Sequence, residues 1–387
     1  MTSMFISGDE AVAQGVALAR PDVISAYPIT PQTVVVEELS SMVAAGTLDA
    51  TYLHVESEHS ALSAALGASA SGVRAFTATS SQGLLYMAEL LTYVSGGGFP
   101  VVMMNANRST ALPWNIYGDQ RDSISLLDHG WIQAYARDAQ EALDLTLMAF
   151  RIAEDPRVRT PFMVCLDGFS LTHTYETVDV PTQQQADAFL PLYETDNCFD
   201  FEHPVSIGFS AGPDTNDIFK LREHEHMLAT LDVLADVEAD FERVFGRHYT
   251  GPLEGYRCDD ADYVLVTLGT TAGLAHDVVD ELRSEGLAAG CLRIRYLRPF
   301  PSQQLACALA SAKAACVVEQ DISFGYEGTV FTDVNSALFS AGVHVDTYDF
   351  IGGLGGRDMT PGDIRHVFDI AREGGPTVNW LGLGVQR

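Results

Sequence analysis

The sequence predicts an α/β protein of two domains, the first of which is built on a parallel sheet. Short apolar runs typical of strands alternate with amphipathic runs typical of helices, and this alternation produces parallel sheets with helices on both faces. The chain has 387 residues, of which 47% are hydrophobic, so it is too long for one ordinary core and apolar enough for two. We place the first domain at residues 1–250, including a long connection at about 176–250, and the second at 251–387.

The first domain begins with a helix. Ser7 and Glu10 have the spacing of a capping box, which predicts that this helix starts just after Ser7. The second helix is expected to have Thr30 as its N-cap and Pro31 as its first residue. Helices alternate with continuous or nearly continuous apolar runs, which predict strands at 23–27, 51–56, 73–79, 99–108 and 161–167.

The alternation stops in the connection and resumes after it. Residues 217–247 form a polar run that predicts one long helix, which could serve as a clamp over a neighbouring protein. The second domain then shows four apolar runs with helices after them, which predict strands at 262–267, 290–297, 315–320 and 343–350.

Composition excludes several classes of protein. A net charge of −30 makes nucleic acid and anionic membranes poor partners. The six cysteines are scattered without any Cys-x-x-Cys pair, which argues against a zinc site, a disulfide scaffold or an iron–sulfur cluster held by this chain alone. No apolar run approaches the roughly 20 residues that cross a bilayer, and the first residues do not resemble a secretory signal. We therefore expect a cytoplasmic protein.

Polar side chains gather where strands of the first domain end. In open parallel sheets, ligands bind beyond the carboxyl ends of the strands. The segments at these ends carry a hydroxyl, two carboxylates, amides and a guanidinium, and they are Tyr27–Thr30, Glu56–Glu58, Thr79–Gln82 and Asn105–Arg108. The sequence therefore places the candidate site at this edge.

Six ordered stretches form a pattern that covers nearly the whole chain. They are AYPITPQT, VESEHSALSAALGASASG, FTATSSQGLLYM, the series NANRS…NIYGDQRDS…GWIQ, RIRYLRPFP and GGLGGRDMTP. Together they resemble the alpha chain of the multi-subunit 2-oxoacid:ferredoxin oxidoreductases, and they are most similar to the pyruvate type.

The resemblance implies a fold and a reaction. The first domain would be the pyrimidine-binding domain of a thiamine diphosphate enzyme, and the second would be similar to the carboxyl-terminal domain of transketolase. The implied reaction is reversible: pyruvate, CoA and oxidised ferredoxin give acetyl-CoA, CO2 and reduced ferredoxin.

The resemblance also implies partners. The thiamine diphosphate would be shared with a beta subunit, which binds the phosphates and Mg2+. The iron–sulfur (4Fe-4S) clusters would lie on partner subunits, among them gamma and delta (ferredoxin-like) subunits. This chain would then be active only in a heteromeric complex.

Roles for individual residues follow from the same resemblance. Glu58 is expected to be the catalytic acid that hydrogen-bonds the pyrimidine nitrogen of thiamine and so activates the cofactor. Thr30 and Arg108 are expected to bind the substrate carboxylate, for which an arginine is a bidentate partner. Gln82 and Ile29 are expected on the cofactor side, and no residue is assigned to a metal.

Each assignment has a structural alternative that the residues alone leave open. Glu56 is a rival to Glu58, and an acid at the amino end of a helix is also favoured by the helix macrodipole. Thr30 could serve only as an N-cap. For Arg108 the alternative is a surface ion pair with Asp119 or Asp122.

The role of the turn before Gln82 and the identity of the substrate are also undecided. Ser81 could cap a helix rather than place Gln82 against a cofactor. Ile29, Trp114 and Ile116 could line an apolar pocket for a methyl-sized substrate. Arg121 could instead serve a second carboxylate, so the diacids 2-oxoglutarate and oxalate stay as alternatives to pyruvate. A branched-chain oxoacid also stays open, because Tyr117–Arg121 could reshape the pocket.

Two other hypotheses about the function of the chain remain, and neither involves 2-oxoacid oxidation. One is a non-catalytic α/β assembly subunit whose site residues are only structural. The other is a stand-alone nucleotide-binding enzyme, which is disfavoured because no G-x-G-x-x-G follows the first strand.

Overall fold

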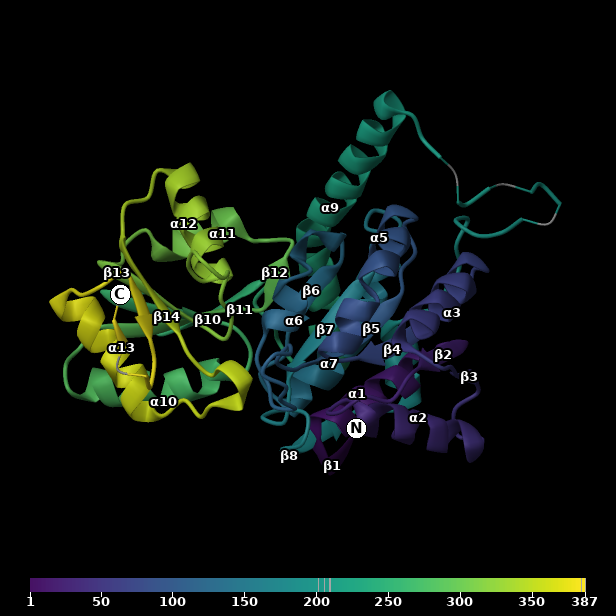
Figure 1. The fold of residues 1–387 in the computed structure, drawn as a ribbon. Helices are drawn as coiled ribbons and strands as arrows, with labels where there is room; N and C mark the ends of the chain where they lie inside the picture. The colour runs from purple at the N-terminus through teal and green to yellow at the C-terminus, as the bar shows by residue number, and fades with distance from the viewer. Residues whose placement is uncertain (201, 205, 209, 384, 387) are drawn as a thin grey trace.

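The structure consists of two α/β halves that lie side by side (Figure 1). It is a computed structural model, and it describes residues 1–387 apart from 201, 205, 209, 384 and 387. Each half is built around a mainly parallel sheet, which has seven strands among the described residues. The predicted fold class is therefore confirmed.

The first sheet has the strand order β12-β6-β7-β5-β4-β2-β3. Its neighbouring strands are parallel except for the pair of β12 and β6. Most of these strands are apolar on both sides because helices cover both faces. Their bounds are β2 (Val23–Ala26), β3 (Thr51–His54), β4 (Ala75–Thr79), β5 (Val102–Asn107), β6 (Ile132–Tyr135), β7 (Phe162–Asp167) and β12 (Tyr296–Arg298).

Two hydrophobic clusters lie on opposite faces of this sheet. Met104 of β5 packs in one cluster and its neighbour Met103 in the other, since successive side chains of a strand point in opposite directions. The first cluster contains side chains of α1 (Gly8–Ala19), α2 (Thr33–Ala44) and α7 (Ala139–Ala153). The second contains side chains of α3 (Glu58–Ala70), α4 (Gln82–Tyr86), α5 (Ala88–Gly96) and α6 (Arg121–Ile124).

Helix starts were predicted with mixed success. The capping box of Ser7 and Glu10 is present at the start of α1, so that prediction is confirmed. The N-cap expected at Thr30 is wrong, because α2 begins at Thr33 with Gln32 before it. The Gln32 amide donates to Tyr27 O at 3.0 Å, and this bond keeps the Pro-containing corner as a loop two residues longer than expected.

The connection after β7 contains more structure than the sequence indicated. Strand β8 (Tyr175–Val180) pairs antiparallel with an N-terminal strand, β1 (Thr2–Ser7), and α8 (Gln183–Phe189) follows. The long helix is confirmed as α9 (Pro213–Phe245). Its second half packs into the first cluster through Phe241 and Phe245, whereas its first half projects from the body (Figure 1).

The second sheet has the order β16-β15-β14-β13-β10-β11-β9, with antiparallel strands at both edges. One face packs against α10 (Thr271–Ser284) and α13 (Pro361–Glu373), and the other against α11 (Ser302–Leu309) and α12 (Thr329–Ala341). The strands are β9 (Leu253–Tyr256), β10 (Tyr263–Thr267), β11 (Ala289–Ile294), β13 (Ala314–Glu319), β14 (Asp346–Ile351), β15 (Val378–Trp380) and β16 (Val385–Gln386).

A strand from the second half of the chain completes the sheet of the first half. The run at 290–297, expected as one strand, divides into β11 in the second sheet and β12 in the first. Tyr296 and Arg298 of β12 pair with Ala134 and Gln133 of β6. The domain boundary near residue 250 therefore stays a prediction, since a strand beyond it completes the first sheet.

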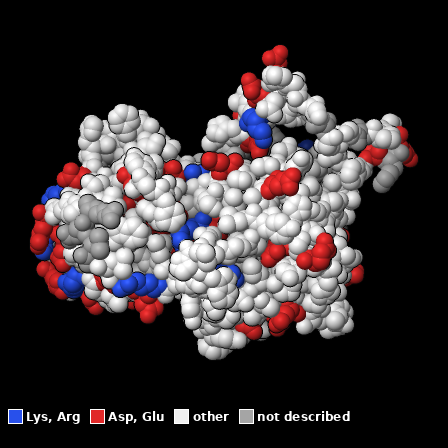
Figure 2. All heavy atoms as spheres, in the orientation of Figure 1, with Lys and Arg blue, Asp and Glu red and all other residues white. Residues whose placement is uncertain are grey.

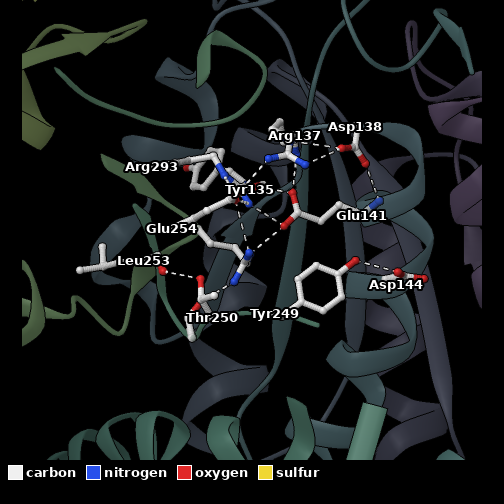
Figure 3. A network of polar contacts seen from close by, with 12 residues as sticks. Tyr135, Arg137, Asp138, Glu141, Asp144, Tyr249, Thr250, Leu253, Glu254 and Arg293 are labelled. Carbon is white, nitrogen blue, oxygen red and sulfur yellow. Dashed lines mark hydrogen bonds and ion pairs between the residues drawn. The ribbon is translucent and has the colours of Figure 1, made fainter. Parts of the chain in front are cut away.

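A buried network of ion pairs lies beside this strand (Figure 3). Glu141 of α7 accepts hydrogen bonds from Arg293 at 2.7 and 2.8 Å and from Arg295 at 2.6 Å. Burial by itself would raise the pKa of Glu141, but the two arginines more than offset it and lower the pKa to about 2. Arg137 extends the network to Glu254 at 2.6 Å.

The surface carries far more acidic than basic side chains, as the face in Figure 2 shows. Among the residues that the structure describes, no helix is long and apolar enough to cross a membrane.

Candidate active site

The four predicted segments meet at the carboxyl edge of the first sheet. From β2 the chain passes to β3 on one side and then returns to β4 on the other, so the connections diverge at β2 and β4. Such a switch point is where open parallel sheets bind ligands.

Arg108 is the centre of the cluster. One terminal nitrogen donates to the backbone carbonyl of Thr30 at 2.7 Å, and the other makes a longer contact of 3.4 Å with the Gln82 side chain. The residue is only 5% exposed, and its Nε–H is buried without a hydrogen-bond partner. The guanidinium therefore has donors that the described protein does not use.

The electrostatics of Arg108 suit an anionic ligand. Burial lowers the pKa of Arg108, while the nearby carboxylates of Asp122 and Glu58 act in the opposite direction. The guanidinium also lies over the Trp114 ring, 6.0 Å from its centre, at the limit of a cation–π contact. A carboxylate ligand would pair with a charge that is already partly removed from water.

Thr30 contacts this cluster through its backbone. Its carbonyl accepts from Arg108, whereas its side chain is exposed and its hydroxyl has no hydrogen bond to the described protein. The carbonyl contact was not predicted, and the hydroxyl is free to meet a ligand.

Glu58 is the first residue of α3 and is buried, with 9% of its surface exposed. Ser57, not Glu58, caps the helix by accepting from the Ser60 amide. A Cβ added at Gly83 would lie 2.7 Å from Glu58 Oε1 and 2.7 Å from Thr79 Oγ1, so the glycine leaves room for the carboxylate. No hydrogen bond from the described residues reaches that carboxylate.

Glu56, the rival acid, has a different environment. Its side chain is exposed and accepts from Ser60 Oγ at 2.6 Å, a bond that lowers the pKa of Glu56. It lies outside the contacts that join Glu58, Gly83 and Thr79.

Gln82 lies between Arg108 and the turn that follows β4. Its Oε1 accepts from Ser81 Oγ at 2.6 Å. Ser81 makes no capping bond to α4, so the capping alternative does not occur. Ile29 is half-buried beside Thr30, and its expected place on the cofactor side stays a prediction.

Asp122 is the residue that sequence reasoning missed. It is fully buried, and it accepts hydrogen bonds from the backbone amides of Ser81 at 2.9 Å and Arg108 at 3.1 Å. Sequence reasoning treated it only as an ion-pair partner for the Arg108 side chain. Asp119, the other suggested partner, pairs with Arg121 at 2.7 Å. The sequence did contain a signal. Backbone amides at the ends of strands need hydrogen-bond acceptors, and Asp122 is an acidic residue that follows several strand ends.

Comparison with known proteins decides the family. The model of "Pyruvate flavodoxin/ferredoxin oxidoreductase, thiamine diP-bdg" matches residues 14–238. That of "Pyruvate:ferredoxin oxidoreductase core domain II" matches residues 261–364. Pyruvate synthase subunit PorA of Methanothermobacter thermautotrophicus is 43% identical over 383 residues, which are 99% of each chain.

The chain belongs to the pyruvate:ferredoxin oxidoreductase family. The predicted resemblance is thereby confirmed, and the first half is a thiamine diphosphate-binding domain of this family. Another member, ketoisovalerate oxidoreductase subunit VorA of Pyrococcus horikoshii, is 41% identical over 366 residues, which cover 94% of this chain and 92% of that one.

Solved structures support the fold of this family member. The 2-oxoglutarate:ferredoxin oxidoreductase of Magnetococcus marinus aligns with a TM-score of 0.74 at 21% identity, over 96% of this chain. This chain spans 65% of the length of that solved chain. A split-gene transketolase aligns with a TM-score of 0.54 at 13% identity, over 95% of this chain and 98% of that one.

The residues present fit the pyrimidine half of thiamine diphosphate. Only 9% of the Glu58 surface is exposed, its carboxylate has no hydrogen bond to the described protein, and Gly83 keeps the space beside it open. By contrast, no group of three metal-binding side chains occurs among the described residues. The roles of Glu58, Thr30, Arg108, Gln82 and Ile29 toward ligands stay predictions.

Proposed function

We propose that this chain is the alpha subunit of a complex that oxidises pyruvate. In the proposed reaction, pyruvate, CoA and two oxidised ferredoxins give acetyl-CoA, CO2, a proton and two reduced ferredoxins. The observation that supports this most is the meeting of Arg108, which has unused donors, and Glu58, which has an unused carboxylate, in a thiamine-binding domain.

Glu58 and Gln82 would hold the pyrimidine of thiamine diphosphate, with Gly83 giving it room. When bound, the cofactor supplies the carbon nucleophile and the electron sink that a 2-oxoacid needs to lose CO2. Glu58 would hold a proton at the pyrimidine nitrogen. The phosphates, Mg2+, the iron–sulfur clusters and the ferredoxin contact are proposed to lie on beta, gamma and delta partner subunits.

Arg108 and the Thr30 hydroxyl would hold the substrate carboxylate. An arginine with spare N–H donors binds a carboxylate in a fixed orientation, which places the neighbouring keto carbon. The Thr30 carbonyl and Gln82 keep the guanidinium in place before the substrate arrives.

The proposed substrate is a monocarboxylate. Arg121, the candidate for a second carboxylate, donates to Asp119 through two nitrogens, at 3.0 and 2.7 Å. A guanidinium neutralised in this way is a poor receptor for 2-oxoglutarate. A branched-chain oxoacid is the second candidate, because VorA-type relatives are nearly as similar to this chain as PorA-type relatives.

The test is a substrate panel on the complex purified with its partner subunits. CoA-dependent viologen reduction is measured with pyruvate, 2-ketoisovalerate, 2-oxoglutarate and oxalate. We expect pyruvate to give the highest kcat/KM. A higher kcat/KM with another of the four acids would contradict the assignment of pyruvate as the substrate. A complex that is inactive with all four would contradict the proposal that it is a 2-oxoacid oxidoreductase.

Arg108→Ala tests the substrate contact in the same assay. We expect the pyruvate KM to rise about 100-fold, the factor given by a charge-assisted hydrogen bond of about 3 kcal/mol. Arg121→Ala is the matched control and should leave the pyruvate KM near the wild-type value. Equal effects of the two variants would contradict the assignment of Arg108.

A further inference from the structure

We propose that Asp122 is a positioning residue that holds the Arg108 turn and the Gln82 turn in one arrangement for substrate binding. The inference rests on the proposed function of Arg108. Asp122 makes no hydrogen bond to the guanidinium, although its charge acts on it through space, so its hydrogen bonds would position Arg108 through the backbone that carries it.

The contacts of Asp122 join three segments of the chain. One carboxylate oxygen accepts from the amides of Ser81 at 2.9 Å and Arg108 at 3.1 Å, and from the Asn105 side chain at 3.2 Å. The other accepts from the Asn107 side chain and the Ser123 amide, both at 2.8 Å. The turn after β4, the end of β5 and the start of α6 are thus fixed to one side chain.

Only a carboxylate satisfies these donors. An ionised Asp has two acceptor oxygens, whereas Asn of the same shape has one acceptor and one NH2 group. In Asp122→Asn, the NH2 group would face N–H donors on whichever side it lies. With the NH2 group on one side, the amides of Ser81 and Arg108 would lose their acceptor. With it on the other side, the Asn107 side chain and the Ser123 amide would lose theirs. Either way, the three joined segments lose part of their connection with little change in side-chain volume.

The surroundings make this acceptor sensitive to pH. Burial raises the pKa of Asp122 to about 6, although its hydrogen bonds act in the opposite direction. The charged and titratable groups that interact with Asp122 are Arg108, Tyr135 and Cys165. Two further acids act on these neighbours, Asp321 on Tyr135 and Asp167 on Cys165. Burial raises the pKa of Tyr135 and of Cys165 as well, so both stay neutral as Asp122 titrates.

Asp122→Asn in the assembled complex is the first test. A shift of the substrate-binding group by about 1 Å can cost as much as 100-fold, so we expect the pyruvate KM to rise by about 10-fold or more. Asp144→Asn is the matched control, because Asp144 is equally buried but accepts from Arg247 and Tyr249, which make no contact with the Arg108 or Gln82 turn. It should lower the melting temperature and leave KM unchanged.

A double-mutant cycle separates positioning from general damage. If Asp122 acts through Arg108, then Asp122→Asn should have little further effect on the pyruvate KM in the Arg108→Ala background. Independent, multiplicative effects of the two changes would overturn the inference.

The pH profile gives a readout that a structural role would not move. We expect the wild-type pyruvate KM to rise as pH falls through about 6 and the Asp122→Asn variant to lack this change. If the wild type oxidises pyruvate but Asp122→Asn behaves like Asp144→Asn, the positioning role is wrong and the proposed function stands. A wild type without pyruvate activity would instead reject the proposed function.

Discussion

Glu58 and Gly83 depend on each other at the scale of single residues. The carboxylate reaches the edge of the sheet because its neighbour on α4 has no side chain, and a Cβ there would lie 2.7 Å from Glu58 Oε1. The pair shows why an acid two residues from Glu56 occupies such a different environment: one side chain turns into the crevice and the other toward water.

Changing Glu58→Gln should abolish turnover of the assembled complex while leaving assembly intact. The amide cannot transfer the proton, and loss of a positioned acid or base costs about 100- to 10,000-fold. The measurement is CoA-dependent viologen reduction, with Glu56→Gln as the control. Comparable rates for wild type and Glu58→Gln would favour the non-catalytic assembly subunit.

Gly83→Ala should weaken thiamine diphosphate binding by pushing the Glu58 carboxylate aside. The added methyl group would meet two oxygen atoms at 2.7 Å. Titration of the complex with the cofactor measures the change. Gly67→Ala on α3 is the matched control: nothing lies within 4 Å of its Cβ, and alanine should stabilise that helix by up to about 1 kcal/mol. Unchanged cofactor affinity in Gly83→Ala would contradict the assigned geometry.

At the scale of elements, the sequence predicted those strands and helices that have a local periodic pattern or belong to a motif of the family. The strand ends, the helix after Glu58 and the long helix α9 were predicted because each has a local pattern. The short strand β6 was missed, and β12 was merged with β11, because their positions depend on pairing between distant segments. Asp122 was missed for a similar reason, since its partners are amides that come together only in the folded sheet.

The buried ion-pair network belongs to this scale as well. Arg293 and Arg295 share two carboxylates, Glu141 and the more exposed Glu254. Glu141→Gln removes the buried one, and breaking a buried pair costs about 3 to 5 kcal/mol. We expect a corresponding loss in the free energy of unfolding, measured with urea. Glu242→Gln, at an exposed pair with His248, should change it by less than about 0.5 kcal/mol.

The pH dependence of this difference follows from the lowered pKa of Glu141. Because its folded pKa of about 2 lies below the unfolded value of 4.5, the carboxylate stabilises the fold above pH 4.5 and loses this effect as pH falls toward 2. The stability gap between wild type and Glu141→Gln should therefore shrink over that window. A gap that stays constant with pH would contradict the role of the charge.

At the scale of the whole molecule, the two halves are held together by shared structure. Strand β12 fills an edge of the first sheet, and Arg293 brings a charge from the second half to Glu141 in the first. If the chain is produced as two polypeptides, 1–250 and 251–387, we expect a tag on either piece to recover both. Residues 1–250 produced alone should aggregate, since β6 would then present an open edge. Recovery of a well-folded 1–250 fragment would contradict this.

The strand that crosses from one half to the other also limits motion. A hinge between the halves would have to separate β12 from β6 and pull charged groups out of a buried network at the same moment. We therefore expect the two sheets to move together as one frame. Any closure over the substrate has to come from what this frame carries: the exposed loop with Leu112 and Trp114 beside Arg108, and the surfaces of neighbouring subunits.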